Sequence, residues 1–485
     1  MSNAVFKAGY LPGIKDSEVQ WHRETIGAPH APMTIDLPVL SNDQMLALVA
    51  RVQRASELHL KTMNVSDIVR VLERLTARLL DHQDPYRQEL ERLLPKATGF
   101  DAEMVRLNLN SYLQTFRGMQ LHRFVAEDFN NPKILDEFQP RIQGGWSKAF
   151  GPNLLVHIWA GNVPALPMWS FMAGLLVKSG SIGKVSRAEP VFASLLARLL
   201  AEVEPTWAEC FAVVWWPSEH SKEQTLLRLA DVVLAYGGND ALNEMKAQIP
   251  VTTRFLAHGH KLSFSIVSKS ALSVRKGPYV ARQAALDVAR YDQQGCYSPQ
   301  MIFVERGAGV TPKDFAELLS HELINLEHKL SPRELTIEES AQAANWRHSH
   351  ELTSLNTPST TILGNSSSKS TVVFSDVPLP LTAGPLNRNI LVVAVDDLEE
   401  LLTLIAPQRL YLQSVGLAVN PEELLDLSER LGKLGITRIC ALGSMTSPEA
   451  GWHHDGRFSL LDLVRMVDID ASTEREAERF TSYES

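Results

Sequence analysis

The chain has 485 residues, of which 45% are hydrophobic and 21% are charged, with a formal net charge of -9 at pH 7. These values fit a globular protein of two or three domains, and the net negative charge and lack of a basic block argue against a nucleic-acid-binding surface. The three cysteines, Cys210, Cys296 and Cys440, lie far apart, which indicates neither a disulfide framework nor a metal site. Together with a charged N-terminus that lacks an apolar core, this pattern predicts a cytoplasmic protein.

One segment resembles a membrane span. Residues 154–177 contain no Asp, Glu, Lys or Arg and are long enough to cross a bilayer. However, Gly161, Pro164 and Pro167 lie near its centre and would break a lone spanning helix. The segment is therefore predicted to be a buried strand, a tight loop and a buried helix, with no membrane span.

Residues 1–118 are predicted to form a separate, mostly helical region. Apolar residues recur at helical spacing over 42–60 and 65–80, with Ser41 and Ser66 as candidate N-caps. No residue pattern here indicates chemistry, which favours a role in packing or in substrate gating.

Short apolar runs alternate with helical patterns from about residue 150 onward. Strands are expected at 154–159, 181–185, 211–216, 232–236, 264–267, 300–305, 371–374, 390–395, 410–419 and 437–442. Strands and helices at this spacing predict an α/β fold with parallel sheets covered by helices. We expect a dinucleotide-binding domain over 119–262, a catalytic domain over 263–442, and a C-terminal segment over 443–485 that packs back or mediates oligomerisation. The motif G-x-G-x-x-G is absent.

Cys296 lies at the junction between a helical pattern and a strand pattern, directly after Gly295 and three residues before Pro299. A thiol at such a junction is held on a rigid scaffold and can face a cleft, which suits a nucleophile. The alternative is that Cys296 is a small buried hydrophobic residue. Gly295 is expected to let the backbone turn sharply and approach a ligand.

Six stretches, taken in order, resemble the aldehyde dehydrogenase superfamily and, within it, the LuxC-type long-chain fatty acyl-CoA reductases. They are His157-Ile-Trp-Ala-Gly-Asn-Val-Pro164, Gly183-Lys-Val-Ser-Arg-Ala-Glu-Pro190, Ala235-Tyr-Gly-Gly-Asn239, Gly259-His-Lys261, Gln293-Gln-Gly-Cys-Tyr-Ser-Pro-Gln300 and Ala383-Gly-Pro385. The resemblance covers about residues 150–470. It implies two parallel-sheet α/β domains and a thiol-dependent reduction of acyl thioesters to aldehydes.

The resemblance assigns two catalytic residues. Cys296 would attack the thioester carbonyl and carry the acyl group. Asn162 would donate its side-chain amide to the developing oxyanion together with the Cys296 backbone N–H, a role that an amide fills without titrating. For Asn162 the alternative is a turn residue that stabilises its own loop.

The same resemblance places the cofactor. Lys184 matches the lysine that contacts the adenosine ribose, and the contact is expected to extend to Ser186 and Arg187. A guanidinium at Arg187, where many NAD-preferring members carry a glutamate, favours a 2′-phosphate and therefore NADPH. Gly237 and Gly238 precede a predicted helix whose N-terminus would receive the pyrophosphate.

Two positions depart from the superfamily pattern. Where hydrolytic members carry a glutamate before the Gly-x-Lys stretch, this chain has Ala257, with His258 beside it. Where the superfamily has a glutamate that holds the nicotinamide ribose, this chain has Leu381. The first departure suits a reductase that does not pass acyl groups to water, and the second leaves nicotinamide positioning open.

The favoured function is NADPH-dependent reduction of an acyl-CoA or acyl-protein thioester, with an acyl-protein synthetase as a possible partner and a homo-oligomeric assembly. The alternatives are an aldehyde dehydrogenase that works in the oxidative direction and a non-redox acyl-carrying subunit. Several histidines have open roles. His453 and His454 either line the cleft or are structural, and His348 and His350 are expected on a solvated, loop-like segment.

Overall fold

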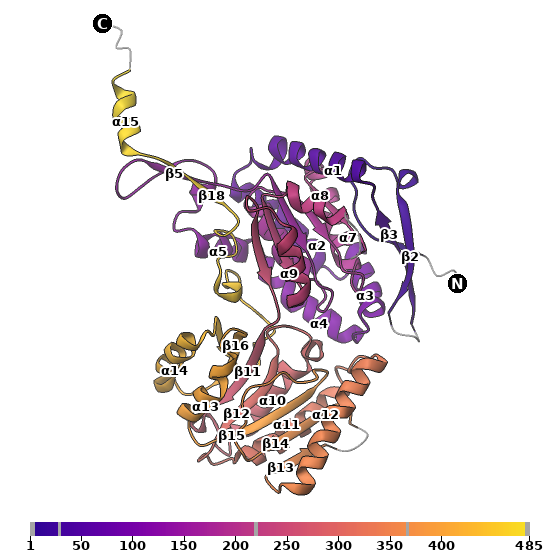
Figure 1. The fold of residues 1–485 in the computed structure, drawn as a ribbon, viewed down its shortest axis with the longest axis vertical. Coiled ribbons are helices and arrows are strands. Elements are labelled where there is room, and N and C mark those ends of the chain that lie inside the picture. The colour runs from indigo at the N-terminus through magenta and orange to yellow at the C-terminus, as the bar shows by residue number, and fades with distance from the viewer. Residues whose placement is uncertain (1–4, 28–30, 218–221, 365–367, 481–485) are drawn as a thin grey trace.

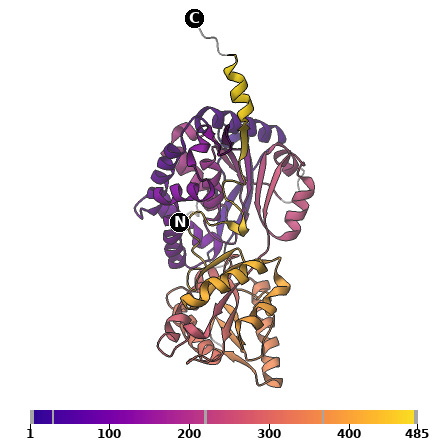
Figure 2. The ribbon, with the colours of Figure 1, turned by 90° about the vertical axis from the view of Figure 1, so that its left-hand side faces the viewer.

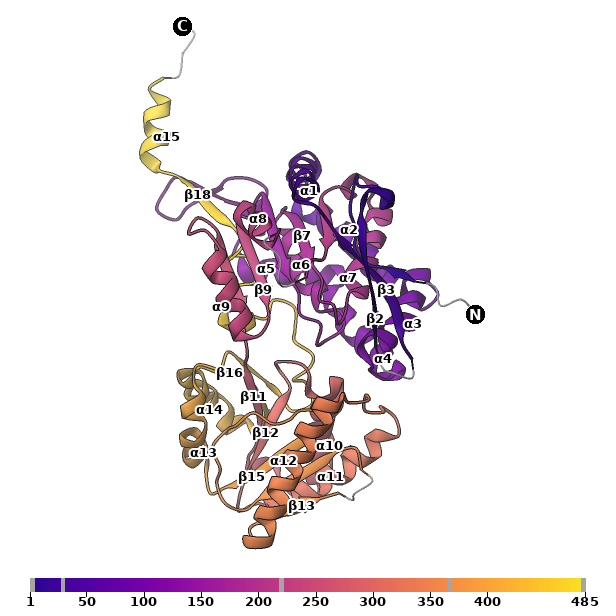
Figure 3. The ribbon, with the colours of Figure 1, turned by 45° about the vertical axis from the view of Figure 1, so that its right-hand side comes forward.

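The computed structural model describes residues 5–27, 31–217, 222–364 and 368–480. Two bodies follow one another along the long axis, and the C-terminal helix α15 (Ala471–Glu478) projects away from the first of them (Figures 1 and 2). Each body is built on its own sheet, and β11 leads from the first body into the second (Figure 3).

The first sheet has five parallel strands in the order β10-β9-β6-β7-β8. They are β6 (Leu154–Ile158), β7 (Gly180–Lys184), β8 (Phe211–Val214), β9 (Val232–Tyr236) and β10 (Arg254–His258). The predicted alternation is thus confirmed, and the span-like segment is β6, a loop and α6 (Leu166–Leu176). The strand order reverses between β6 and β9, which is where open α/β sheets bind ligands beyond the strands' carboxyl ends.

Helices cover both faces of this sheet. One face carries α1 (Asn42–Ala55), α8 (Lys222–Leu229) and α9 (Asn239–Gln248); the other carries α2 (Val65–Leu80), α3 (Pro85–Thr98), α4 (Ala102–Leu113), α5 (Gly118–Asp128), α6 and α7 (Val191–Val203). The N-terminal helices α2–α5 share one hydrophobic core with α6 and α7, so they form a layer of the first body rather than a separate unit.

The predicted helix starts in this region are partly correct. Ser41 caps α1 through a capping box with Gln44. Asn64, not Ser66, is the N-cap of α2. The region also contains a small sheet of β1 (Phe6–Lys7), β3 (Met33–Val39) and β2 (Gln20–Ile26). The sequence boundary at 118 remains a prediction, as do those at 262 and 442.

The second sheet has the order β13-β14-β15-β12-β11-β16-β17, and only β13 runs antiparallel to its neighbour. The strands are β11 (Leu262–Val267), β12 (Pro299–Glu305), β13 (Thr360–Leu363), β14 (Thr371–Ser375), β15 (Asn389–Val395), β16 (Leu412–Ala418) and β17 (Arg438–Ala441). Helices α10 (Gly277–Ala289) and α11 (Pro312–Glu327) cover one face, and α13 (Leu398–Ile405) and α14 (Pro421–Leu434) cover the other. This arrangement confirms the second α/β domain.

Helix α12 (Ile337–Asn356) lies on the outer side of the second body, next to β13 (Figure 3). Its sequence shows no continuous apolar stripe, in keeping with a helix that has no fully buried residue. For this reason the helix was not predicted. His348 and His350 lie on this helix, and the expectation of a loop-like segment there is wrong. His350 packs edge-on against Trp346, with ring centroids 4.6 Å apart.

The C-terminal segment returns to the first body. Ala450, Leu460, Leu463 and Val464 are buried in the core that α2–α7 share. Beyond them, β18 (Arg465–Ile469) pairs antiparallel with β5 (Trp146–Phe150), which also pairs with β4 (Gln139–Pro140). Among the helices that the structure describes, none is both long and apolar enough to cross a membrane.

Candidate active site

Cys296 lies in a short loop between two well-packed elements. Helix α10 ends at Ala289, a single helical turn spans Arg290–Gln293, and β12 begins at Pro299. The Ser263 hydroxyl, from the neighbouring strand β11, donates to the Cys296 carbonyl oxygen at 2.7 Å. The loop is therefore anchored to the adjacent strand β11, as the sequence pattern predicts for a nucleophile on a rigid scaffold.

Glycine is required at position 295 for a reason other than the expected approach of a ligand. A Cβ placed on Gly295 would lie 2.4 Å from the ring of Tyr297, which folds back over it. Such a contact is far inside van der Waals distance, so only glycine accommodates this ring. Tyr297 in turn forms part of the wall around the thiol.

The backbone just before the loop is strained. Tyr291, Asp292 and Gln293 have φ values of 50°, 48° and 64°. Three consecutive non-glycine residues in the left-handed region are energetically unfavourable and persist only where surrounding contacts impose them. Opposite them, residues 386–388 adopt φ values of 61°, 54° and 61°, and the Asn387 N–H donates to the Asp292 carbonyl at 3.0 Å.

Cys296 opens into a cavity of about 410 Å³ between the two bodies. Asn162 from the first body lines the same cavity, as do Gly237 and Gly238. Part of the wall comes from α4 of the N-terminal region, through Asn108, Ser111 and Tyr112. Much of the rest is apolar or aromatic, with Val163, Pro164, Leu166, Trp169, Tyr291, Pro448 and Trp452 among the lining residues.

Asn162 is an exposed residue on an otherwise largely buried loop that follows β6 and packs closely against the loop after β7. A Cβ on Gly161 would lie 2.8 Å from the Ser186 Oγ and 2.9 Å from the Ala188 Cβ, so glycine permits this approach. The Asn162 Nδ2 donates to the carbonyl oxygen of Gln294 at 2.7 Å, which holds the amide next to the cysteine loop. The structure thus brings together the two residues predicted to be catalytic.

The environment of the thiol disfavours its ionised form. Burial raises the pKa of Cys296 to about 11, and the nearby Asp455 carboxylate adds to this effect. The Gln413 side chain and the backbone N–H groups of Cys296 and Tyr297 act in the opposite direction, because they favour the thiolate. The resting cysteine is therefore a protonated thiol whose anion already has hydrogen-bond donors around it.

On β10 the residue that faces the cavity is His258, not Ala257. Successive side chains of a strand point to opposite faces. Ala257 packs with Phe255 against the core that contains α8 and α9, whereas His258 lines the cavity. The residues before the Gly-x-Lys stretch, Ala257 and His258, include no carboxylate. The side chain that β10 directs into the cavity is the imidazole of His258.

The predicted cofactor residues lie at the carboxyl ends of the first sheet. Lys184 ends β7, and its Nζ lies 5.3 Å from the centroid of the Trp216 ring. Ser186 and Arg187 are on the loop that follows. The Arg187 Nη1 forms an ion pair with Glu24 of β2 at 3.1 Å, with 69% of the arginine side chain exposed.

Gly237 and Gly238 follow β9 and precede α9, whose N-cap is Gly238. A Cβ on Gly238 would meet no atom within 4 Å, so open space lies beside this helix N-terminus. Leu381, in contrast, is fully buried in the second body's core. The cavity edge near it is formed by Ala383, Gly384 and Leu386.

Three further cavity residues had no firm assignment from the sequence. His454 and Asp455 come from the C-terminal segment and Gln413 from β16. The Gln413 Nε2 donates to the Asp455 Oδ1 at 2.6 Å. The only sequence feature that pointed to this part of the cavity was the motif Trp-His-His-Asp-Gly at 452–456. From that motif, His453 and His454 could each either line the cleft or be structural. Of the two, His454 lines the cavity, whereas His453 packs edge-on against Phe458.

The acyl-CoA reductase (LuxC) family matches residues 60–466 of this chain. A long-chain acyl-protein thioester reductase of Photorhabdus luminescens is 26% identical over 441 residues, covering 90% of this chain and 87% of the relative. One from Aliivibrio fischeri is 25% identical over 440 residues, covering 88% of each.

Solved structures show the same fold at low identity. Aldehyde dehydrogenase 21 of Physcomitrella patens superposes with a TM-score of 0.74 at 12% identity, over 97% of this chain and 99% of that one. The NADP-dependent glyceraldehyde-3-phosphate dehydrogenase of Bacillus halodurans, complexed with NADP, gives 0.72 at 12% identity, over 96% and 98%. The chain has the aldehyde dehydrogenase fold and belongs to the acyl-CoA reductase (LuxC) family.

Proposed function

We propose that the protein reduces a long-chain acyl thioester to the aldehyde with NADPH, through an acyl group held on Cys296. The observation that carries this proposal is the shared cavity. A half-buried thiol from the second body and an amide donor from the first body line one largely apolar space, next to the ligand-binding edge of a doubly wound sheet.

The proposed acyl transfer uses groups that the geometry brings together. The Cys296 thiolate attacks the thioester carbonyl carbon, and the carbonyl oxygen becomes an oxyanion. Asn162 and the Cys296 backbone N–H donate to that oxyanion, and because the Asn162 Nδ2 carries two N–H groups, one of them stays available beside the bond to Gln294. The tetrahedral intermediate then expels the donor thiol and leaves the acyl group on the cysteine.

The residues present fit a phosphorylated dinucleotide. The open space beside Gly238 at the N-terminus of α9 suits a pyrophosphate. Lys184 and Ser186 would then face the adenosine ribose, and Arg187 would leave Glu24 to pair with a 2′-phosphate. When bound, the cofactor supplies the hydride that reduces the acyl group. The apolar and aromatic side chains that line the cavity would exclude water from that step.

The acyl donor is proposed to be an acyl-CoA or an acyl-protein thioester, the second matching the printed names of the relatives. An acyl-protein synthetase remains a proposed partner. The three cysteines are free thiols, in keeping with the proposed cytoplasmic location. The projecting β18 and α15 offer an edge for a second copy, so we also propose a homo-oligomer.

Incubation with myristoyl-CoA and NADPH tests the function directly. NADPH oxidation should be accompanied by release of myristaldehyde in equal amount. With myristoyl-CoA alone, the enzyme should gain one acyl mass on Cys296 and release little fatty acid. Oxidation of aldehyde with NADP⁺ but no reduction of the thioester would favour an oxidative dehydrogenase. Acylation without saturable NADPH binding would favour the acyl-carrying subunit.

A further inference from the structure

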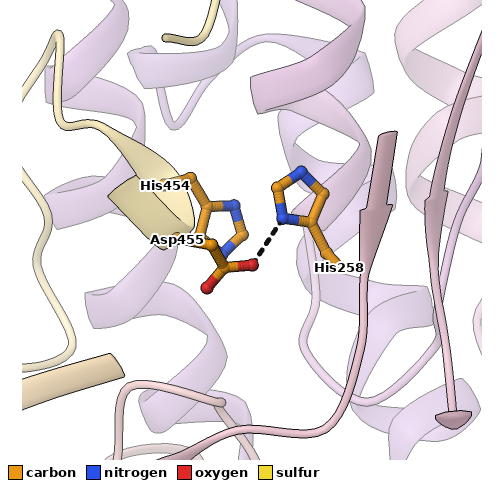
Figure 4. Close-up of side chains that lie close together, drawn as sticks. All are labelled: His258, His454 and Asp455. Carbon is orange, nitrogen blue, oxygen red and sulfur yellow. Dashed lines mark hydrogen bonds and ion pairs between the residues drawn. The ribbon is translucent and has the colours of Figure 1, made fainter. Parts of the chain in front are cut away.

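His258 and Asp455 form a hydrogen-bonded pair inside the active-site cavity. The His258 Nδ1 lies 2.7 Å from the Asp455 Oδ2, and 9% and 7% of the two side chains are exposed. The histidine ends β10 of the first body, and the aspartate comes from the C-terminal segment (Figure 4). Two parts of the chain that are remote in sequence thus supply one acid–base pair beside the nucleophile.

The charge state of Asp455 fixes which way this bond runs. Burial alone would raise the pKa of Asp455, but the hydrogen bonds from His258 and Gln413 lower it below its ordinary value. An ionised carboxylate can only accept, so the His258 Nδ1 carries the proton. The Nε2 of His258 is then the basic nitrogen of the ring.

Other rings hold His258 in place. Its imidazole stacks on that of His454 with centroids 4.2 Å apart and planes 7° from parallel, and on Tyr236 of β9 at 4.8 Å. Burial lowers the pKa of His454 to about 3, and Lys261 and Arg438 act in the same direction, so His454 is neutral. Tyr236 and His454 also contact each other, with ring centroids 5.9 Å apart, so the three rings form one cluster beside the Asp455 carboxylate.

Asp455 is itself held in an unfavourable conformation. Its φ of 54° lies in the left-handed region, and Gln413 donates to its second oxygen at 2.6 Å. Strained residues that surrounding contacts maintain are concentrated at functional sites. The Gln413 side chain also interacts with the Cys296 sulfur, so one amide links the acid–base pair to the thiol.

The same three side chains could be considered as metal ligands, because ligand atoms of His258, His454 and Asp455 lie within 4.8 Å of one another. The ring geometry disfavours this. Imidazole lone pairs lie in the ring plane, and two parallel stacked rings direct theirs side by side rather than at one point. The existing bond from His258 to Asp455 is also shorter than the spacing of about 3.3 Å between two ligands on a tetrahedral zinc with bonds of about 2.0 Å.

We propose that His258 is a catalytic acid–base residue that moves the thiol proton during acyl transfer, and that Asp455 and Gln413 position it. This inference rests on the proposed function and adds the proton path to it. The Nε2 of His258 accepts the proton from the Cys296 sulfur as that sulfur bonds to the carbonyl carbon. The same nitrogen returns the proton to the leaving thiolate as the original carbon–sulfur bond breaks, so the step consumes no proton and no electrons.

The need for such a base follows from the protonated resting thiol. With a pKa of about 11, only about one molecule in 10⁴ would hold a thiolate at pH 7. A positioned base removes this limit by taking the proton as the bond forms, a contribution of typically about 10²–10⁴ in rate. It also protonates an alkyl thiolate, which is a poorer leaving group than an aromatic one.

The choice of leaving thiol provides the test. Acylation of Cys296 is followed by rapid quench and mass spectrometry with two substrates, myristoyl-CoA and the 4-nitrothiophenyl thioester of myristic acid. His258→Ala should slow acylation by both thioesters, because the Cys296 proton loses its acceptor, and should slow the reaction with myristoyl-CoA about tenfold more than that with the activated thioester, because only the coenzyme A thiolate needs a proton in order to leave. Asp455→Asn should show the same bias more weakly. His453→Ala, a neighbour outside the cavity, should behave like the unmodified enzyme with both.

No loss on either thioester would overturn the role of His258 as the base, and an equal loss on both would overturn its return of the proton to the leaving thiolate. If His258→Ala does not fold, the test uses Asp455→Asn and the ratio of its acylation rates with the two thioesters. Loss of a purely structural residue would lower both rates equally, whereas loss of a residue that positions His258 would lower the rate with myristoyl-CoA more. The unmodified enzyme separates this inference from the function. If it forms no acyl-enzyme, the proposed function itself fails; if it acylates and then reduces with NADPH while the variants show no leaving-group bias, only the proton path fails.

Discussion

Arg388 and Asp292 form an ion pair that is almost completely removed from solvent, with the arginine Nε donating to the Asp292 Oδ1 at 2.6 Å. The two residues belong to the two strained backbone runs, residues 291–293 and 386–388. The pair therefore ties the segment before the nucleophile to the loop before β15. It holds one strained run against the other, and the Cys296 loop starts where the first run ends.

Breaking this pair should destabilise the whole protein. Asp292→Asn leaves a buried guanidinium without its counter-charge, and removal of one partner of a buried pair typically costs about 3–5 kcal/mol of unfolding free energy. Chemical denaturation measures the loss. Glu399→Gln removes one of the two ion-pair partners of Arg430, at an exposed site, and should change stability by less than about 1 kcal/mol. Similar small effects at both positions would contradict a structural role for the buried pair.

Cys296→Ser should retain the fold and lose both reductase activity and the acyl adduct. A hydroxyl in this place is far less nucleophilic than a thiol and lacks the thiolate's polarizability. The adduct is detected by mass spectrometry after incubation with acyl-CoA. Cys440→Ser is the matched control, since Cys440 lies on β17 outside the cavity. Retention of the adduct in Cys296→Ser would place the nucleophile elsewhere.

Asn162→Ala should lower kcat by about 10²–10³ with little change in KM, because the amide acts on charge that develops only in the transition state. Steady-state kinetics with acyl-CoA measure both constants. Asn325→Ala, at an exposed position of α11, provides the same chemical change away from the cavity. If KM rises while kcat is unchanged, Asn162 serves substrate binding or loop stability instead.

Arg187→Ala should reduce kcat/KM for NADPH more than for NADH, by about 10–100-fold in the ratio, because a charge-assisted bond to the 2′-phosphate is lost. Glu24→Gln is the informative companion. It removes the residue that pairs with Arg187 in the absence of cofactor and should preserve or strengthen the preference for NADPH. An unchanged ratio in Arg187→Ala would show that its guanidinium stays with Glu24 or solvent.

The parts of the fold that follow from local sequence patterns were predictable. The buried strands β6, β9 and β15 are runs of mostly apolar residues. This sequence pattern is typical of parallel strands that are covered on both faces. Edge strand β10 and helix α12 were missed because neither buries a complete apolar face: β10 has charged and histidine ends, and α12 packs on the second core through residues that are only half-buried, such as Trp346.

The candidate site was predictable only in part. Cys296 and Asn162 each sit in a distinctive local stretch, so their proposed roles could be assigned from sequence, and both line the cavity. The pairing of His258 with Asp455 joins residues 197 positions apart and depends on where the C-terminal segment returns. No local pattern contains that information. The side of β10 that faces the cavity also depends on the packing of α8 and α9, which decides between Ala257 and His258.

Glu189 should make stability depend on pH. Burial raises its pKa to about 7, although the Val191 and Phe192 N–H groups, which it caps, act in the opposite direction. The unfolded state gives up this proton near pH 4.5, so the folded state binds more protons between about pH 4.5 and 7 and stability falls across that window. The loss is complete above pH 7 and amounts to about 3 kcal/mol.

Glu189→Gln should remove this dependence, since the amide oxygen can still accept from the helix N-terminus without a charge. Thermal unfolding at pH 5 and pH 8 should show equal Tm values for variant and unmodified protein at the lower pH and a higher Tm for the variant at pH 8. A variant that is less stable at both values would show that the ionised carboxylate is the better cap.

The return of the C-terminal segment has a consequence for synthesis on the ribosome. Cys296 and its supporting strands emerge well before Asp455, and β5 emerges long before β18, the strand that pairs with it. A nascent or truncated chain ending before Asp455 thus exposes the free edge of β5 and carries Cys296 without the aspartate that bonds to His258. Such chains should be inactive toward acyl thioesters and prone to edge-to-edge association, so that catalytic competence and protection from aggregation are acquired together as the last part of the chain is made.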